Sequence, residues 1–415
     1  MSAGAPPQSP APPPAARPVV KRRGERTGLY ALVGAVLAVA VLVGVGYSTN
    51  WFGLQKSSTT TPEGACVTGV TLDGAGANFV LALVSNWQAS YHAATKNMVN
   101  YNPDGAGAGI TSLSEKTVDF AATDEPLNAS EVASMPGLTL TLPFTGGAVA
   151  IVYNIHGYSG PFNLTGFLLA SIYLGTISDW SDPALAAINP GLPSTHQPIT
   201  TVHRIDAAGT TYVLTNLLSD DSTAWASGPG TSILPTWPST PNPQVAEKGN
   251  SALAKYVSGT PNTIGYVDLA DAKSNSLSIA GIQNPTGQTH GGHYIVPTVA
   301  NTQAAINNLS GQPLPPATGD WSKVSWVNSP GSFDYPLATL SYFMIFENPG
   351  IGLSPSLNKT QVLIQWLEWT FTTGQSAAAG LYYASPPANL LTQDKNALSE
   401  INFNGASVPG CTTQS

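Results

Sequence analysis

The chain has 415 residues, of which 42% are hydrophobic and only 9% are charged. This length exceeds a single ordinary core and predicts two lobes or domains, and the high apolar content excludes a chain that is disordered throughout. The formal net charge is −8 with no basic stripe, which argues against a nucleic-acid partner.

The first 50 residues differ in charge from the rest of the chain. They hold five basic residues and one acidic residue, which leaves 10 basic and 22 acidic residues beyond them, a net charge of −12. Arg204 is the only arginine after residue 50. Any positive charge that recognises an anion is therefore confined to few positions.

The sequence of the N-terminal region predicts a membrane anchor. Residues 1–27 are rich in Pro and Ala and predict a disordered cytoplasmic tail. Residues 28–47 are 20 uncharged residues, the length of a transmembrane helix, and the basic residues before them place the rest of the chain outside the cell. Residues 48–64 form a polar spacer. A cleaved signal peptide is the alternative, although the apolar run is long for that role.

The chain contains two cysteines, Cys66 and Cys411, one near each end of the exported part. In an oxidising compartment this pattern suggests one disulfide that ties the termini together. Two independent thiols remain the alternative.

A strand, a Gly-rich turn and a helix recur along the exported part. Residues 68–79 predict a strand and a turn, and the apolar residues that follow have helical spacing. These are Val80, Leu83, Val84, Trp87 and Tyr91. The pattern recurs at residues 97–118 and 200–218. Glycine permits each tight turn and exposes amide groups at a helix start, where anions are attracted.

Several chemistries lack their motif. No Rossmann fingerprint, P-loop or nucleophile elbow occurs, so the sequence predicts no cofactor and no enzymatic activity. His290 and His293 in HGGH lack a third ligand placed by the sequence, which favours a solvated Gly-rich loop over a metal site.

The segment HRIDAAGTT at residues 203–211 carries the clearest site. Arg204 and Asp206 lie on one side of an extended run, so the carboxylate can hold the guanidinium in position. Gly209 and Thr210 follow at a helix start, and together these residues predict an oxyanion cradle. Taken alone, the segment is also compatible with a surface ion pair.

With this segment included, the exported part resembles the phosphate-binding protein of phosphate ABC importers. Six pieces match in order along residues 71–390. They are GAGANF (74–79), VDFAATDEPL (118–127), IYLGTISDW with NPGLP (172–193), HRIDAAGTT (203–211), EKGNSALAKYV with IGYVDLADA (247–272) and FTTGQSAAAGLYYASPP (371–387).

The resemblance implies an α/β fold of the type II periplasmic-binding-protein class, in which two lobes are joined by two crossing strands. We expect those strands at residues 148–154 and 337–346. The first lobe would comprise residues 65–151 and 340–415, and the second lobe residues 152–339. A first lobe built from both chain ends would be consistent with a Cys66–Cys411 disulfide.

The resemblance also implies a role for each matching site residue. Asp124 would accept the ligand's proton, Arg204 would bind its charge, and Asp206 would orient Arg204. The backbone and side-chain donors would be Asn78, Phe79, Gly209 and Thr210. A carboxylate at position 124 would accept from a P–OH group and repel a fully deprotonated anion such as sulfate.

Three positions depart from the family's usual hydroxyl residues. Asn78 stands where Thr is usual, and Ala106 and Ala208 stand where Ser is usual. Asn78 could still donate through its amide, whereas the alanines offer only backbone groups. These changes place the ligand and its affinity in question more than the fold.

The resemblance therefore implies a membrane-anchored extracellular receptor that binds inorganic phosphate and delivers it to an ABC permease with ATP-hydrolysing subunits. Alternatives are a receptor for another tetrahedral oxyanion, a phosphate sensor, a hydrolase of phosphate esters and a carbohydrate-binding module. Nine tryptophans and 15 tyrosines prompt the last of these, although helical spacing and neighbouring prolines favour packing.

Overall fold

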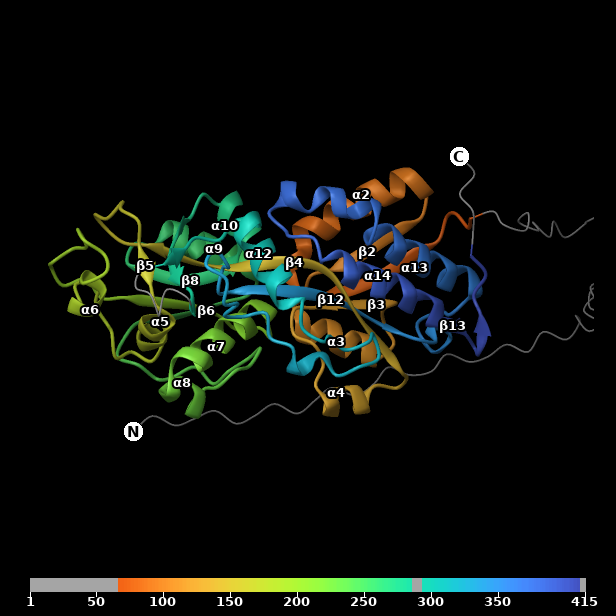
Figure 1. Cartoon of the computed structure of the whole chain (residues 1–415), viewed down its shortest axis with the longest axis horizontal. Coiled ribbons are helices and arrows are strands. Elements are labelled where there is room, and N and C mark those ends of the chain that lie inside the picture. The colour runs from red at the N-terminus through yellow and green to blue at the C-terminus, as the bar shows by residue number, and fades with distance from the viewer. Residues whose placement is uncertain (1–65, 286–292, 411–415) are drawn as a thin grey trace, which may run out of the picture. The chain divides into compact units, whose positions relative to one another are not determined.

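A computed structural model describes residues 66–285 and 293–410 (Figure 1). The predicted tail, the predicted anchor, His290 and Cys411 lie outside the described residues. None of the described helices is long and apolar enough to cross a membrane. The Cys66–Cys411 disulfide stays a prediction.

The secondary structure alternates between strands and helices through most of the described chain. The strands are β1 (Thr71–Gly76), β2 (Met98–Asn102), β3 (Phe120–Thr123), β4 (Thr139–Asn154), β5 (Asn163–Leu164), β6 (Thr200–Arg204), β7 (Gln244–Glu247), β8 (Thr263–Asp268), β9 (Ser278–Ile279), β10 (Gly281–Gln283), β11 (Tyr294–Ile295), β12 (Ala338–Phe346), β13 (Asn402–Phe403) and β14 (Ala406–Ser407). The α-helices are α2 (Leu81–Thr95), α3 (Ala106–Ser114), α4 (Ala129–Ser134), α5 (Gly166–Tyr173), α6 (Pro183–Ala186), α7 (Gly209–Asp221), α8 (Thr223–Ser227), α9 (Asn250–Gly259), α10 (Leu269–Ser274), α12 (Val299–Leu309), α13 (Leu357–Thr370) and α14 (Ala388–Ala397). Short 3₁₀ turns are η1 (Asn78–Val80), η2 (Trp321–Lys323), η3 (Pro349–Ile351), η4 (Thr373–Ala377), η5 (Ala379–Leu381) and η6 (Leu398–Glu400).

One continuous path of strands joins two lobes, in the order β2-β1-β3-β12-β4-β8-β6-β7, with β9 beside β4. The first lobe contains β2, β1, β3 and β12, packed against α2, α3 and α13. The second lobe contains β8, β6 and β7, packed against α7, α9 and α10. β1 pairs in parallel with β2 and β3, and β6 pairs in parallel with β7 and β8, so the helix starts that follow these strands lie at one edge of each lobe's sheet.

β4 is the strand that belongs to both lobes. Residues 139–148 pair with β12, and residues 149–154 pair with β8. The sequence placed this crossing strand at residues 148–154, nine residues late, because its continuous burial removes the alternation that marks where a strand begins. The expected strand at residues 337–346 matches β12, but β12 pairs with β3 and β4 and thus lies in the first lobe. The predicted lobe boundaries at residues 151 and 340 stay predictions.

The predicted helix after residue 79 is confirmed as α2, which buries Leu83, Val84, Trp87 and Tyr91. Trp87 contacts the rings of Phe144 and Trp366, at centroid distances of 5.8 and 6.2 Å. Six tryptophans are buried in the two hydrophobic cores. They are Trp87, Trp180, Trp225, Trp321, Trp326 and Trp366. This placement supports packing, rather than sugar stacking, as the reason for the aromatic content.

Asp394 is a buried carboxyl group in the first lobe, and we predict that its removal stabilises the protein. The side chain is fully buried, and within the described chain neither of its carboxylate oxygens accepts a hydrogen bond. Burial raises its pKa well above the ordinary value, so the folded protein binds a proton that the unfolded chain releases above about pH 4. Its contribution to stability is therefore largest in acid and is lost as pH rises through the folded pKa.

We expect Asp394→Asn and Asp394→Leu to raise the free energy of unfolding at pH 7 by about 1–3 kcal/mol, and by less at pH 4. Denaturant unfolding at the two pH values measures the difference. The exposed neighbour Asn396→Leu provides the control, and a loss of stability at pH 7 in both Asp394 variants would contradict the prediction.

Candidate functional site

Helix starts without side-chain caps meet between the lobes. Most described α-helices begin at a Ser, Thr, Asn or Asp whose side chain accepts from the first turn; examples are Asn128 for α4, Thr165 for α5 and Thr298 for α12. The turn η1 and the helices α3, α7 and α9 instead begin at Ala77, Gly105, Ala208 and Gly249, with no side-chain cap. Their first N–H groups need other acceptors, which an anion would supply.

The segment at residues 77–79 is fixed by contacts within the first lobe. Gly76 has φ +141°, and a Cβ there would lie 2.0 Å from the carbonyl oxygen of Ala122, so the turn requires glycine. The Tyr101 hydroxyl donates to the Ala77 carbonyl at 2.8 Å, and the Tyr383 hydroxyl donates to the Phe79 carbonyl at 2.7 Å. The two tyrosines fix the Ala77–Asn78 and Phe79–Val80 peptides.

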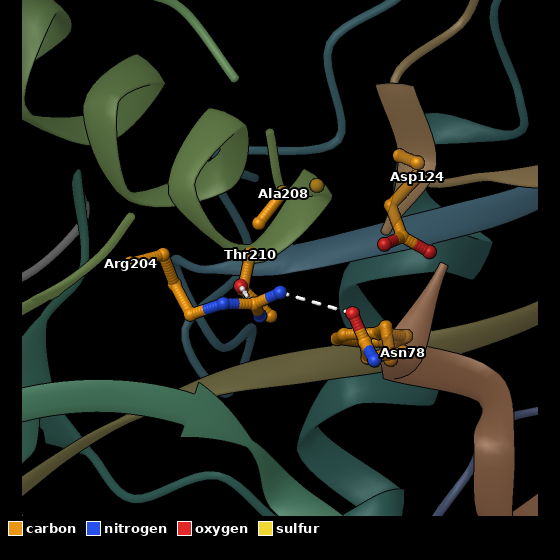
Figure 2. Close-up of a pocket in the computed structure, with 8 residues that line it drawn as sticks. Asn78, Asp124, Arg204, Ala208 and Thr210 are labelled. Atoms are coloured by element: carbon orange, nitrogen blue, oxygen red, sulfur yellow. Dashed lines mark hydrogen bonds between the residues drawn. The ribbon is translucent and has the colours of Figure 1, made fainter. Parts of the chain in front are cut away.

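Arg204 ends β6 in the second lobe and is buried, with 1% of its surface exposed. Each of the five guanidinium N–H groups has a protein acceptor. Asp206 accepts two of them, one from Nε at 2.7 Å. Nη1 donates to Asn250 and, at 3.3 Å, to Thr210. Nη2 also donates to the carboxamide oxygen of Asn78 at 3.0 Å, which Figure 2 shows as a dashed line.

Two acidic residues, Asp206 and Asp268, hold Arg204 and Asn250 in place through hydrogen bonds. Burial opposes ionisation of Asp206, but the hydrogen bond and charge of Arg204 outweigh it, so the pKa of Asp206 lies below its ordinary value. The Gly249 N–H also donates to Asp206 at 3.2 Å. Asn250 donates to Asp268 at 2.7 Å, which turns its oxygen toward Arg204. The guanidinium is therefore held rigidly before any ligand binds.

Asp124 follows β3 in the first lobe and lies beside the start of α7. A Cβ on Gly209 would lie 2.3 Å from Asp124, so only glycine permits this approach between lobes. The Ser341 hydroxyl donates to one carboxylate oxygen at 2.6 Å. Burial raises the pKa of Asp124 to about 7, although the Ser341 hydrogen bond and the Arg204 charge act in the opposite direction. The group is therefore able to accept or share a proton near neutral pH.

These residues line a small, narrow void between the lobes. Its lining comprises Asn78, Phe79, Ala106, Asp124, Arg204, Ala208, Gly209 and Thr210. In Figure 2 the guanidinium and Asp124 approach the region around Asn78 from different elements. The void combines one cation, one titratable acid and the amide groups of helix starts, a donor set suited to a small protonated oxyanion.

The structure brings six of the seven residues predicted for binding to the void, and it places the seventh, Asp206, behind Arg204. Their role in binding stays a prediction. One detail differs from the expectation that Asn78 could donate to the ligand: its carboxamide nitrogen donates to the Pro103 carbonyl, and its carboxamide oxygen accepts from Arg204.

Sequence reasoning missed three supporting residues, Asn250, Asp268 and Ser341. The first two lie within the matched segments EKGNSALAKYV and IGYVDLADA, where the glycine before Asn250 marked another helix start. Ser341 lies in a fully buried strand, and nothing in its sequence surroundings indicates a polar contact.

Of the proposed HGGH motif, His290 lies outside the described residues. The described part of the chain has no group of three or more His, Cys, Asp or Glu residues that could hold a metal ion.

The fold and site define a two-lobed α/β binding protein whose interlobe void is suited to an oxyanion. A family model described as "PBP superfamily domain" matches residues 57–373. The chain belongs to the family of phosphate-binding proteins of phosphate ABC importers.

Individual relatives agree with this assignment. The chain is 34% identical over 344 residues to the phosphate-binding protein PstS of Xylella fastidiosa, covering 81% of this chain and 87% of the relative. It is 33% identical over 321 residues to PstS of Pasteurella multocida, covering 77% and 88%. Among solved structures, the phosphate-binding protein of Stenotrophomonas maltophilia superposes with a TM-score of 0.61 at 17% identity, covering 80% and 94%; this likeness shows the fold.

Proposed function

We propose that this protein is a phosphate receptor that binds the ion between its two lobes and delivers it to an ABC permease in the membrane. The observation that carries the proposal is the buried Arg204, which is braced by Asp206 and lines one void with Asp124 and the uncapped starts of η1, α3 and α7. An enzymatic role is not part of the proposal. The relatives that are named phosphate-binding protein support the proposed role as a phosphate receptor.

Selective binding would follow from the paired charges. Arg204 and the helix-start amides would attract the negative oxygens, and an ionised Asp124 would accept the P–OH proton of hydrogen phosphate. Sulfate has no such proton at neutral pH and would meet the Asp124 carboxylate without a hydrogen bond. The net charge of −12 beyond residue 50 would not steer anions from a distance, so capture would depend on these short-range donors.

Calorimetric titration of the full chain with phosphate, sulfate, arsenate and molybdate at pH 8 tests this function. We expect one binding site, with phosphate and arsenate bound more tightly than sulfate and molybdate. A clear preference for molybdate or sulfate would favour the alternative of a receptor for another tetrahedral oxyanion, which the alanines at positions 106 and 208 keep open. Hydrolysis of a chromogenic phosphate ester, together with bound metal, would favour the hydrolase.

We also propose that residues 28–47 anchor the protein in the membrane with its lobes outside the cell. The run of 20 uncharged residues after a basic cluster supports this topology. The full chain is expected in the membrane fraction after alkaline carbonate washing, and a variant lacking residues 28–47 is expected in the soluble fraction.

Peptide mapping without reductant would reveal the proposed Cys66–Cys411 disulfide. Coprecipitation with permease subunits would separate a transport receptor from a sensor.

A further inference from the structure

Asn78 contacts the centre of the site in an unexpected way. Its carboxamide oxygen accepts from Nη2 of Arg204 at 3.0 Å, and its carboxamide nitrogen donates to the Pro103 carbonyl. Both ends of the carboxamide are thus engaged, which fixes the oxygen toward the guanidinium. We call this contact the Asn78 bridge.

The Asn78 bridge joins the two lobes. The other acceptors of Arg204 in the described chain, Asp206, Thr210 and Asn250, lie in the second lobe, whereas Asn78 belongs to η1 in the first lobe. Since Asp206, Thr210 and Asn250 account for four of the five N–H groups, Asn78 occupies the fifth. An anion that enters the void finds no free N–H on the guanidinium.

The neutral carboxamide oxygen of Asn78 is a good acceptor for Arg204, but its contact with a bound anion is unfavourable. It offers Arg204 a partial negative charge, and in the described chain it is the one first-lobe oxygen that accepts a hydrogen bond from the guanidinium. When an anion approaches, two oxygens compete for one donor, and the carboxamide oxygen faces the anion with the same sign of charge. A threonine hydroxyl at this position would instead donate to the anion.

We propose that Asn78 is an internal competitor of the anion: its oxygen occupies the ligand's position on Arg204, holds the lobes together without ligand, and must be displaced before phosphate binds. This inference rests on the proposed function, because it takes phosphate as the ligand. Asn78 therefore lowers the affinity of the site and sets the concentration range in which the protein responds.

The test is calorimetric titration of the full chain with inorganic phosphate at pH 8, comparing the unmodified protein with Asn78→Thr and Asn78→Ala. Because a hydrogen bond to a charged group is lost and, for Thr, a donor is gained, we expect the dissociation constant to fall about tenfold to a hundredfold for Thr and about tenfold for Ala. Asn100→Thr, at an exposed position on β2, is the matched control and should leave binding unchanged.

Hydrogen exchange of the unliganded proteins provides a second measurement that does not depend on affinity. If the Asn78 bridge holds the lobes together, amides at residues 77–81 and 208–212 should exchange faster in Asn78→Ala, and saturating phosphate should remove the difference. Thermal unfolding verifies that both variants fold.

The outcomes separate this inference from the proposed function. If the unmodified protein binds phosphate and both variants bind equally or more weakly, Asn78 is a ligand rather than a competitor, and the inference is overturned while the function stands. If neither the unmodified protein nor the variants bind phosphate, the proposed function fails and the inference fails with it.

Discussion

Replacing Arg204 with alanine is expected to abolish phosphate binding, with a loss of at least about a thousandfold in affinity. No other arginine occurs after residue 50, and the fully buried guanidinium lines the void, where displacement of the Asn78 oxygen would free one charge-assisted donor for the anion. A hydrogen bond to a charged group contributes about 1.5–3 kcal/mol, so the loss of the one donor that Asn78 would release corresponds to about one to two orders of magnitude. The Coulomb attraction is lost as well. Calorimetric titration of the full chain with phosphate measures the effect.

The controls for Arg204 separate charge from geometry and from folding. Arg204→Lys keeps the charge but not the fork that Asp206 and Asn250 hold, so we expect it to recover little of the binding. Lys255→Ala removes an exposed cation from α9 and should bind normally. Thermal unfolding is needed because Arg204→Ala also leaves the Asp206 carboxylate without its cationic partner. A folded Arg204→Ala protein that binds phosphate within tenfold of the unmodified protein would contradict the proposed site.

Replacing Asp124 with asparagine is expected to relax discrimination against sulfate. The variant keeps the size of the side chain and an oxygen for the Ser341 hydroxyl, but it replaces a carboxylate oxygen with a donor. We expect sulfate affinity to rise about a hundredfold, because a hydrogen bond from the asparagine replaces repulsion by the carboxylate. We expect phosphate affinity to fall about tenfold, because phosphate loses its charge-assisted hydrogen bond to the carboxylate. Competition titrations of phosphate against sulfate at pH 8 measure the ratio, and an unchanged ratio would count against the role of Asp124.

The same carboxyl group predicts a pH dependence in the unmodified protein. The pKa of Asp124 is raised to about 7, so the group is largely ionised at pH 8 and largely protonated at pH 5.5. Sulfate remains a dianion across this range, and its binding should therefore strengthen as pH falls. Burial also raises the pKa of the adjacent Glu125 to about 7, so Glu125→Gln is the control and should keep the pH dependence. Persistence of the pH dependence in Asp124→Asn, or its loss in Glu125→Gln, would assign it to another group.

The residues of the site differ in how far the sequence could predict them. Arg204, Asp206, Gly209 and Thr210 lie within seven positions, where strand alternation and a helix start determine their relative placement locally. Asp124 could be identified only through the family's motif, because its approach to Gly209 depends on how the lobes pack.

The remaining features depend on contacts between distant segments. Ser341 meets Asp124 across 217 positions, and Arg204 meets Asn78 across 126, so no local pattern encodes either contact. The orientation of the Asn78 carboxamide follows from the Pro103 carbonyl beside it. In the fold, strand–turn–helix units were predictable from periodicity, whereas the start of β4 was not, because a strand buried on both faces has none.

A crystal structure of the protein soaked with arsenate tests the central claim most directly, because arsenic marks the position of a tetrahedral oxyanion through its anomalous scattering. The account predicts a single strong arsenic peak in the void, with arsenate oxygens in hydrogen-bond contact with Arg204 and the amides of Phe79 and Thr210, and with the Asn78 oxygen displaced. Arsenic bound elsewhere, with the Asn78 bridge intact and the void unchanged, would contradict it.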